Sequence, residues 1–172
     1  IYDSRLKQIY KINCTLNNLK ILDNSFSKFF LQLNDPLLEE GKNLEEIRNL
    51  YLIKLSSNRE KDLFLGGCSI GPHRSDIQGL NYSKNINLNQ FSTGQQKTAI
   101  LLIIIAQCIN LIENLDSQPI VLLDEICSHL DENNRELILY LINELKVQVF
   151  MSGTEESFFS FLSTKANYCN IT

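Results

Sequence analysis

The sequence predicts an α/β fold in which a parallel sheet is flanked by helices, and three observations support this. Residues 119–123 (PIVLL) are an almost continuous apolar run, which is typical of a strand inside a parallel sheet. Residues 147–151 (VQVFM) form a second run of this kind, and we expect both strands to be buried. Residues 131–146, between them, carry apolar side chains at helical spacing. Strand, helix and strand in succession indicate α/β architecture.

The chain before this region predicts a mainly helical segment. Apolar residues at spacings of three and four predict helices over residues 1–24 and 44–55. Between them, residues 28–33 (KFFLQL) predict a strand that ends at Asn-Asp-Pro. Further along, residues 76–83 and 85–88 have the pattern of a β-hairpin.

The longest helix is expected over residues 95–114. It is apolar nearly all round, so we expect it to be buried on most sides. Its uninterrupted apolar stretch is far shorter than the roughly 20 residues of a membrane span, which favours a core helix and no membrane partner. Residues 155–162 predict a short helix, and residues 168–171 a last strand.

Composition limits the possible functions. The 172 residues carry a formal net charge of −4, so bulk charge does not indicate nucleic-acid binding, although a local basic patch is compatible with it. The five cysteines include no Cys-x-x-Cys pair, which argues against a zinc or redox site. Cys108 and Cys127 lie in apolar surroundings and are expected to be core residues.

Two carboxylates, Asp124 and Glu125, follow the apolar strand at its carboxyl end, where α/β sheets bind ligands. Mg²⁺ prefers oxygen ligands and needs only one or two carboxylates when phosphate and water complete its shell. Asp124 is therefore a candidate metal ligand, and Glu125 a candidate base for an attacking water. The alternative is that a buried strand simply ends in polar residues.

A polar segment, Gln90–Lys97 (QFSTGQQK), precedes the long helix, and we call it the signature segment. A helix N-terminus presents N–H groups and a positive dipole end, which suit an anion. Gly94 allows close backbone approach, Ser92 adds a hydroxyl donor, and Lys97 adds charge. The alternative is that Ser92 or Thr93 only caps a core helix.

Five sequence blocks together resemble an ABC-type ATPase head, and more closely the RecF family of recombination-mediator proteins. The signature segment resembles the ABC signature loop, 120–125 (IVLLDE) the Walker B strand, and 128–131 (SHLD) the D-loop. The blocks 71–76 (GPHRSD) and 149–154 (VFMSGT) also resemble this family, and GPHRSD makes the resemblance more specific.

The resemblance implies an ATP- and Mg²⁺-dependent protein of DNA repair, replication and the SOS response, located in the cytoplasm at the nucleoid. Its implied partners are double-stranded and gapped DNA, a second copy in an ATP-dependent homodimer, and other recombination-mediator proteins. Asp124 would position Mg²⁺, Glu125 would be catalytic, and Ser152 or Thr154 would sense phosphate. Arg74, in the loop after Gly-Pro, would pair structurally with Asp76 or face DNA or a nucleotide. The implied nucleotide-binding residues are Ser92, Thr93, Gly94, Gln95, Lys97 and Asp131.

The resemblance also divides the chain into residues 1–63, the end of a helical arm with a strand and a return helix, and residues 64–172, the C-terminal lobe of the ATPase head. The P-loop pattern Gly-x-x-x-x-Gly-Lys is missing, because Gly66 to Gly71 is followed by Pro72. We therefore expect a C-terminal piece that binds ATP poorly by itself. The alternatives are the head of another ABC- or SMC-class ATPase, or an interaction fragment that does not hydrolyse ATP.

Overall fold

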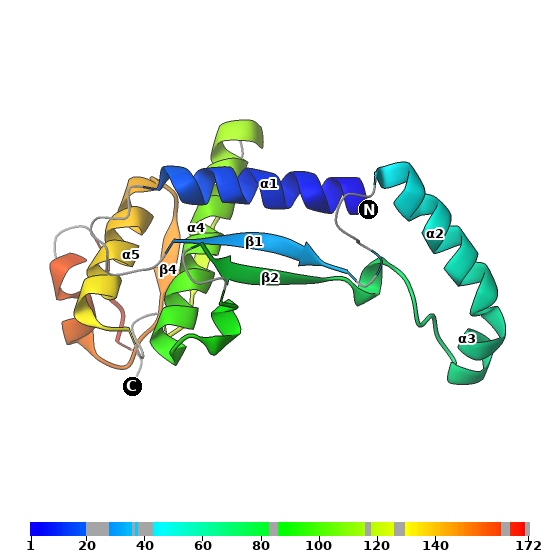
Figure 1. Ribbon diagram of the computed structural model, residues 1–172. Coiled ribbons are helices and arrows are strands. Elements are labelled where there is room, and N and C mark those ends of the chain that lie inside the picture. Colours follow the sequence, from blue (N-terminus) through cyan, green and yellow to red (C-terminus); the bar gives the residue numbers. More distant parts are fainter. Residues whose placement is uncertain are drawn as a thin grey trace. The chain divides into compact units, whose positions relative to one another are not determined.

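The structure is a computed structural model that describes residues 1–19, 28–35, 37, 43–82, 86–115, 118–125, 130–162 and 166–170. The chain forms two compact units (Figure 1). Unit 1 contains Ile1–Leu19 and Ser27–Gln90, and unit 2 contains Phe91–Thr172. The compact units therefore divide between residues 90 and 91, and the expected functional division at residue 63 stays a prediction. Unit 1 extends past residue 63 because the 76–81 strand pairs with the strand that follows residue 28.

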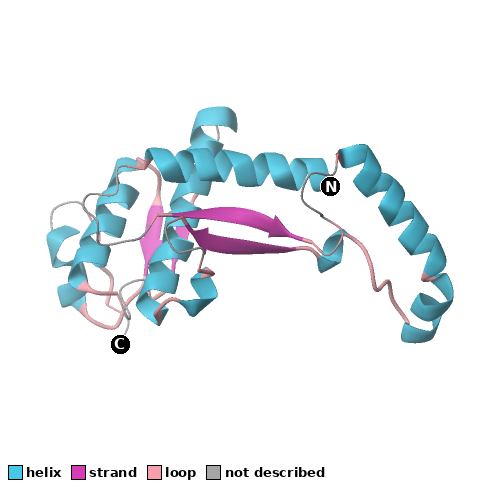
Figure 2. Cartoon of the chain, in the orientation of Figure 1, coloured by secondary structure: helices cyan, strands magenta, loops and turns pink. Residues whose placement is uncertain are grey.

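Unit 1 is built on an antiparallel pair of strands, β1 (Phe29–Asn34) and β2 (Asp76–Asn81). Phe29 pairs with Asn81, and the ladder continues to the pair of Asn34 with Asp76. β1 has a period-2 pattern in which Phe29, Leu31 and Leu33 are buried. Figure 2 shows this strand pair with helical segments before and after it in the chain.

The prediction that residues 76–83 and 85–88 pair as a hairpin is wrong. The main partner of β2 is β1, and the expected second strand is reduced to one bridge between Leu80 and Asn87. β1 offers an apolar face and six paired positions, whereas Leu88–Gln90 form a short 3₁₀ turn, η2. Residues 83–85 lie outside the described part of the chain.

Helix α1 (Tyr2–Asn18) packs against β1 and buries Ile9, Ile12 and Leu16. The Asn13 side chain donates to the Leu31 carbonyl and accepts from the Leu31 N–H, both at 2.8 Å. An amide side chain thus satisfies the backbone of β1 on the edge away from β2. The first expected helix is confirmed up to Asn18, and residues 20–24 lie outside the described residues.

Two further helices complete unit 1. α2 (Leu44–Ser57) begins at Asn43, whose side chain accepts the Glu46 N–H at 2.9 Å, as an N-cap residue does. α3 (Arg59–Leu65) follows after one residue and ends at Gly66, which has φ 71°. Glycine tolerates this left-handed conformation, which is the usual way for a helix to stop. The 3₁₀ turn η1 (Pro72–Arg74) then leads into β2.

Unit 2 contains a β-α-β unit. β3 (Val121–Leu123) and β4 (Val149–Met151) are parallel and paired in register, and α5 (Glu132–Glu144) connects them. The expected strands and helix are confirmed, with shorter strands than expected. The C-terminal segment contains η3 (Glu156–Leu162), a 3₁₀ helix where a short helix was expected. The expected strand at 168–171 is absent from residues 168–170, and Ile171 lies outside the described residues.

Helix α4 (Thr93–Leu115) begins inside the signature segment and supplies much of the core of unit 2. Leu102 and Ala106 are fully buried, and so is Ile138 of α5. Cys108 is also buried, as expected, whereas Cys127 lies outside the described residues. By length and composition alone α4 could cross a membrane, but core helices satisfy the same criteria. Its buried side chains in unit 2 favour the core interpretation.

We expected the strands of unit 2 to be buried on both faces, and α4 to be buried on most sides. Both expectations are partly wrong. Val121 and Leu123 are buried, but Leu122 is 74% exposed and Phe150 is 54% exposed. On α4, Ile100 is 57% exposed. The described residues of unit 2 therefore cover one face of the strand pair and leave the other apolar face open.

Candidate functional site

The carboxyl ends of β3 and β4 bring together three polar residues, Asp124, Glu125 and Ser152, which we call the strand-end cluster. Leu123 pairs with Met151, so the next residues along, Asp124 and Ser152, are neighbours. The Ser152 N–H donates to the Leu123 carbonyl at 3.0 Å, which continues the ladder by one bond. The Ser152 hydroxyl donates to Asp124 Oδ1. Both Asp124 and Ser152 are exposed, so the carboxylate faces solvent at the strand end.

Glu125 is attached to the same cluster through its backbone. Its N–H donates to Ser152 Oγ at 3.0 Å, so one hydroxyl contacts both residues of the Asp-Glu pair. Glu125 has φ 46°, in the left-handed region that residues other than glycine seldom adopt. The chain thus turns sharply at Glu125 immediately after β3.

Lys97 connects the signature segment to this strand end. It lies in the second turn of α4, and its Nζ donates to the Glu125 carbonyl oxygen at 2.6 Å. An ammonium donor makes this a charge-assisted hydrogen bond, which is stronger than a neutral one. The two blocks that sequence analysis connected only by their order, residues 90–97 and 120–125, are therefore in direct contact.

The N-terminus of α4 forms a reciprocal capping arrangement. The Ser92 N–H donates to Gln95 Oε1 at 3.2 Å, and the Gln95 N–H donates to Ser92 Oγ at 3.4 Å. The capping interpretation of Ser92 is thus present in the structure. It does not exclude a ligand, because a hydroxyl that accepts a hydrogen bond still has a proton to donate. Thr93 and Gly94 form the first turn, and the Gly94 carbonyl accepts the Thr98 hydroxyl at 3.0 Å.

Asp131 caps α5. Its Oδ1 accepts the Asn134 N–H at 2.8 Å, and its Oδ2 accepts the Asn134 amide at 2.7 Å. The side chain is exposed, so these contacts leave one side of it open to solvent. The neighbouring D-loop residues Ser128 and His129 lie outside the described part of the chain.

Two further sequence-predicted residues are Thr154, in unit 2, and Arg74, in unit 1. Thr154 is exposed, two residues after Ser152. Arg74 belongs to unit 1, where its guanidinium donates to the Cys68 carbonyl at 3.3 Å. The expected pairing of Arg74 with Asp76 is not among the ion pairs of the described residues, and Asp76 Oδ1 instead accepts the Ile77 N–H. The backbone carbonyl at Cys68 is the nearer acceptor in the turn.

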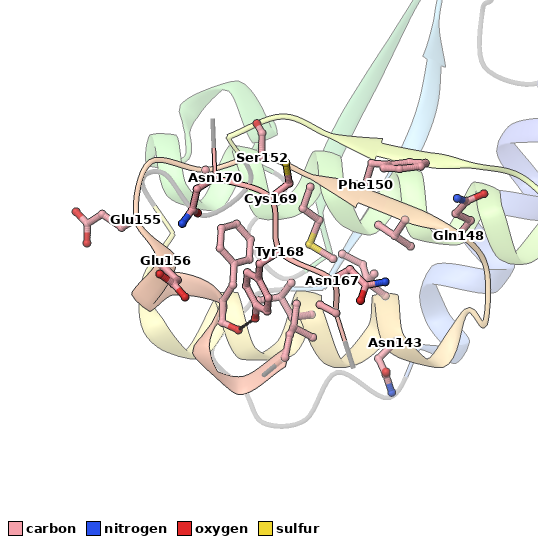
Figure 3. A pocket seen from close by; sticks show the side chains of 18 of the residues that line it. Asn143, Gln148, Phe150, Ser152, Glu155, Glu156, Asn167, Tyr168, Cys169 and Asn170 are labelled. Atoms are coloured by element: carbon pink, nitrogen blue, oxygen red, sulfur yellow. Dashed lines mark hydrogen bonds between the residues drawn. The ribbon is translucent and has the colours of Figure 1, made fainter. Parts of the chain in front are cut away.

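A cavity of about 970 Å³ lies beside β4, between α5, η3 and residues 166–170 (Figure 3). Its wall includes Ser152, Gly153 and Thr154 but, among the described lining residues, neither Asp124 nor Glu125. On one wall the Tyr168 hydroxyl donates to the Phe159 carbonyl. The cavity therefore borders the strand-end cluster without containing its carboxylates.

The strand-end cluster fits a metal ion of one kind. No group of three or more His, Cys, Asp or Glu side chains is found among the described residues, so a cage made of protein ligands alone is absent there. Mg²⁺ needs no such cage when one or two carboxylates act together with substrate phosphate and water. Asp124, exposed and hydrogen-bonded through one oxygen, has the donor chemistry for that arrangement.

The sequence matches the model of the RecF/RecN/SMC N-terminal domain family over residues 37–168. The chain belongs to that family. Its curated relatives include DNA replication and repair protein RecF of Rickettsia prowazekii, which is 33% identical over 156 residues, covering 90% of this chain and 42% of the relative. The RecF protein of Rhizobium meliloti is 34% identical over 123 residues, covering 72% of this chain and 33% of the relative. This RecF-like chain thus spans less than half the length of these relatives.

Solved structures support the same fold. A structure of the recombination mediator protein RecF with ATP, in the RecFOR pathway, aligns with a TM-score of 0.67 and 24% identity. The alignment covers 91% of this chain and 41% of that one. A second RecF structure, with ATPrS, aligns with the same TM-score at 22% identity. The RecF-like chain therefore has the fold of a RecF/SMC ATPase head, as its motifs predict.

The contacts that hold the strand-end cluster together were not predicted from the sequence. Lys97 was expected to add charge for a ligand, and Ser152 or Thr154 to sense phosphate. In the structure the Lys97 and Ser152 side chains also form hydrogen bonds with the Asp-Glu pair. A signal for Ser152 was available. Residues that directly follow two paired parallel strands lie side by side, so Asp124 and Ser152 could have been predicted as neighbours.

Proposed function

We propose that the full-length RecF-like protein is an ATP-dependent DNA-binding ATPase of recombinational DNA repair and replication, in which ATP is held between two heads. The observation that carries this proposal is the contact between the signature segment and the Asp-Glu pair, through Lys97 and the Glu125 carbonyl. Membership of the RecF/RecN/SMC family and the likeness to RecF structures support the same function. The activity of the whole protein is a proposal because the chain spans 42% of the RecF protein of Rickettsia prowazekii.

We assign the metal role to Asp124 and the water-positioning role to Glu125. Asp124 would hold Mg²⁺, directly or through water, and the bound ion would neutralise charge on the ATP phosphates. Glu125 would orient the attacking water and accept its proton. Catalysis of this kind relies on positioning and electrostatics rather than on a covalent intermediate.

The signature segment would bind the nucleotide held by the other copy of the protein. Ser92 would donate its hydroxyl proton, and the backbone at Thr93 and Gly94 would present N–H groups at the positive end of α4. Gln95 and Lys97 belong to the same site through the capping bonds and the Glu125 contact. Asp131, exposed at the start of α5, would meet the partner head. ATP would thereby act as the dimerising ligand.

The phosphate-sensing role falls to Thr154 more easily than to Ser152. A serine hydroxyl has one proton, and Ser152 donates it to Asp124. Ser152 could contact a phosphate as a donor only after that hydrogen bond is released. Thr154 is exposed at the end of the same segment and needs no such exchange.

Double-stranded and gapped DNA, other recombination-mediator proteins and a cytoplasmic, nucleoid-associated location complete the proposal. The functional division into an arm over residues 1–63 and a head lobe over residues 64–172 is part of it. Arg74 is exposed in unit 1 and is a candidate DNA contact. Because the formal net charge is −4, DNA binding would depend on local basic groups and would weaken steeply with salt.

Glu125→Gln in the full-length protein tests the proposal directly. The amide keeps the size of the side chain but cannot accept the proton, so we expect ATP turnover to fall about 10²-fold or more. ATP binding should persist, and the ATP-bound dimer should accumulate on DNA, measured by light scattering and gel shift. Glu144→Gln, an exposed acid at the end of α5, is the matched control. Unchanged turnover in Glu125→Gln would contradict the assigned role.

The same experiment separates the alternatives. The head of another ABC- or SMC-class ATPase would show the turnover defect without preferring gapped DNA. An interaction fragment that does not hydrolyse ATP would show no turnover even in the unaltered full-length protein. The preference for gapped over blunt duplex DNA therefore decides between the first two, and basal turnover excludes or supports the third.

A further inference from the structure

The backbone around Glu125 is held on both sides by side chains from other elements. The peptide N–H before its Cα donates to Ser152 Oγ at 3.0 Å, from the segment after β4. The carbonyl after its Cα accepts from Lys97 Nζ at 2.6 Å, from α4. Two elements that are distant in sequence thus fix the two peptide groups that flank one residue.

The conformation held in this way is an unfavourable one. A side chain at φ 46° costs of the order of 1 kcal/mol, and more favourable backbone regions are open to glutamate. Such a conformation persists where surrounding contacts determine it. Because φ sets the direction of the Cα–Cβ bond relative to β3, the two contacts also set the direction in which the carboxylate leaves the strand end.

The Lys97 contact has a second consequence, because Lys97 and Ser92 move with the same helix end. The Gln96 N–H donates to the Ser92 carbonyl at 2.9 Å, which is the first intrahelical bond of α4. A ligand bound by Ser92 therefore contacts a rigid helical turn whose next residue reaches Glu125. Displacement of that turn would therefore change the Lys97–Glu125 bond.

We propose that Lys97 is a positioning residue for Glu125, assisted by Ser152, and that it couples occupancy of the signature segment to the orientation of the water-positioning acid. This inference rests on the proposed ATPase function and assigns Lys97 a role through Glu125 rather than through phosphate. Its charge matters because an ammonium donor holds the carbonyl more strongly than a neutral donor.

Steady-state kinetics of full-length Lys97→Met test the assignment. We expect kcat to fall about 10-fold or more while KM for ATP stays within about 3-fold, because the lost interaction acts on the chemical step. Lys97→Arg keeps a cationic donor and should recover most of kcat, and Lys97→Gln, a neutral donor, should lie between the two. Lys146→Met removes one exposed charge from unit 2 and should match the unaltered protein. Lys97 is only half-buried, so these variants should fold, which circular dichroism checks.

A double mutant separates positioning from a general structural effect. In a Glu125→Gln background, Lys97→Met should reduce the residual kcat by less than about 2-fold, because both changes act through one residue. Independent effects that multiply would overturn the proposal, and so would a Lys97→Met variant that raises KM for ATP at constant kcat, as a phosphate ligand would. Absence of turnover in the unaltered protein would instead overturn the proposed function, and this inference with it.

Discussion

Two aspartates, one in each unit, follow the last residue of a strand, yet their surroundings differ. Asp35 follows β1 and is 5% exposed. Its Oδ1 accepts the Leu37 N–H at 2.8 Å. Its Oδ2 accepts the Tyr51 hydroxyl at 2.9 Å and the Ser75 hydroxyl at 2.5 Å. Both oxygens of this buried carboxylate are therefore hydrogen-bonded by the protein.

Asp124 follows β3 and is exposed. Its protein donor is the hydroxyl of Ser152, which reaches Oδ1. A buried carboxylate is tolerated only when the protein supplies its hydrogen bonds, and then it has little capacity for a ligand. An exposed carboxylate with one donor among the described residues keeps that capacity. The same residue type at the same place in a strand is thus structural in unit 1 and a candidate metal ligand in unit 2.

Replacing each aspartate by asparagine should give opposite results, and these are the largest effects we expect. Asp124→Asn should lower Mg²⁺-dependent ATP turnover of the full-length protein about 10²-fold, because charge next to the phosphates is lost. Its effect on stability should stay within about 0.5 kcal/mol, as for exposed positions generally. The measurements are steady-state turnover and hydrogen exchange of the amides in β3 and β4.

Asp35→Asn should instead destabilise β1 and β2 by about 2 kcal/mol, because a neutral amide replaces the ionised acceptor of the Leu37, Tyr51 and Ser75 hydrogen bonds. Hydrogen exchange of the β1 and β2 amides measures this. The two variants are controls for each other, since the chemical change is identical. The comparison fails if Asp35→Asn leaves β1 and β2 protected, or if Asp124→Asn leaves turnover intact.

Local pattern was sufficient to predict most helices and the parallel strands. The period of 3.6 over residues 131–146 and the apolar run before Asp124 depend only on nearby residues. Non-local pairing was predicted less well. β2 pairs with β1 across about 47 residues rather than with the nearer segment 85–88. The sequence of a strand does not determine which strand it pairs with when two apolar segments could both be its partner.

The candidate site shows the same limit. Spacing and family resemblance singled out Asp124, Glu125 and the signature segment, and these stay predictions until tested. The sequence pattern did not reveal that Lys97 donates to the backbone carbonyl of Glu125. Every residue has such a carbonyl, so the residue type does not indicate which one accepts the hydrogen bond. The Asp35 cluster was missed for a related reason, since two of its partners, Tyr51 and Ser75, are 16 and 40 residues away in the sequence.

Tyr51→Phe sharpens the comparison with a smaller effect. The Tyr51 hydroxyl donates to Asp35 and lies 2.6 Å from the Tyr2 hydroxyl. Its loss removes one donor from a buried carboxylate, so we expect unit 1 to lose about 1.5 kcal/mol. Hydrogen exchange of the β1 and β2 amides provides the measurement. Tyr140→Phe, a 52% exposed tyrosine on α5, is the control and should change little. Equal effects of the two variants would show that Asp35 does not need the Tyr51 hydroxyl.

The smallest expected effect is the pH dependence of unit 1, because opposing causes set the pKa of Asp35. Burial raises this pKa, but hydrogen bonds from Ser75, Tyr2, Leu37 and Tyr51 outweigh burial and leave the pKa below its ordinary value. A folded-state pKa below the unfolded one adds stability above the unfolded value, near pH 4, and that stability is lost as pH falls through the folded pKa.

Protection of the β1 and β2 amides should therefore decline as the full-length protein is acidified below about pH 4, and the decline should be weaker in Asp35→Asn. Ser75→Ala removes the largest contribution that lowers the pKa of Asp35, so its decline should begin at a higher pH than in the unaltered protein. If amide protection declines in parallel in Asp35→Asn and in the unaltered protein, the buried carboxylate is not the group that makes the stability of unit 1 depend on pH. The stabilising role of its charge would then be wrong, even though its hydrogen bonds remain.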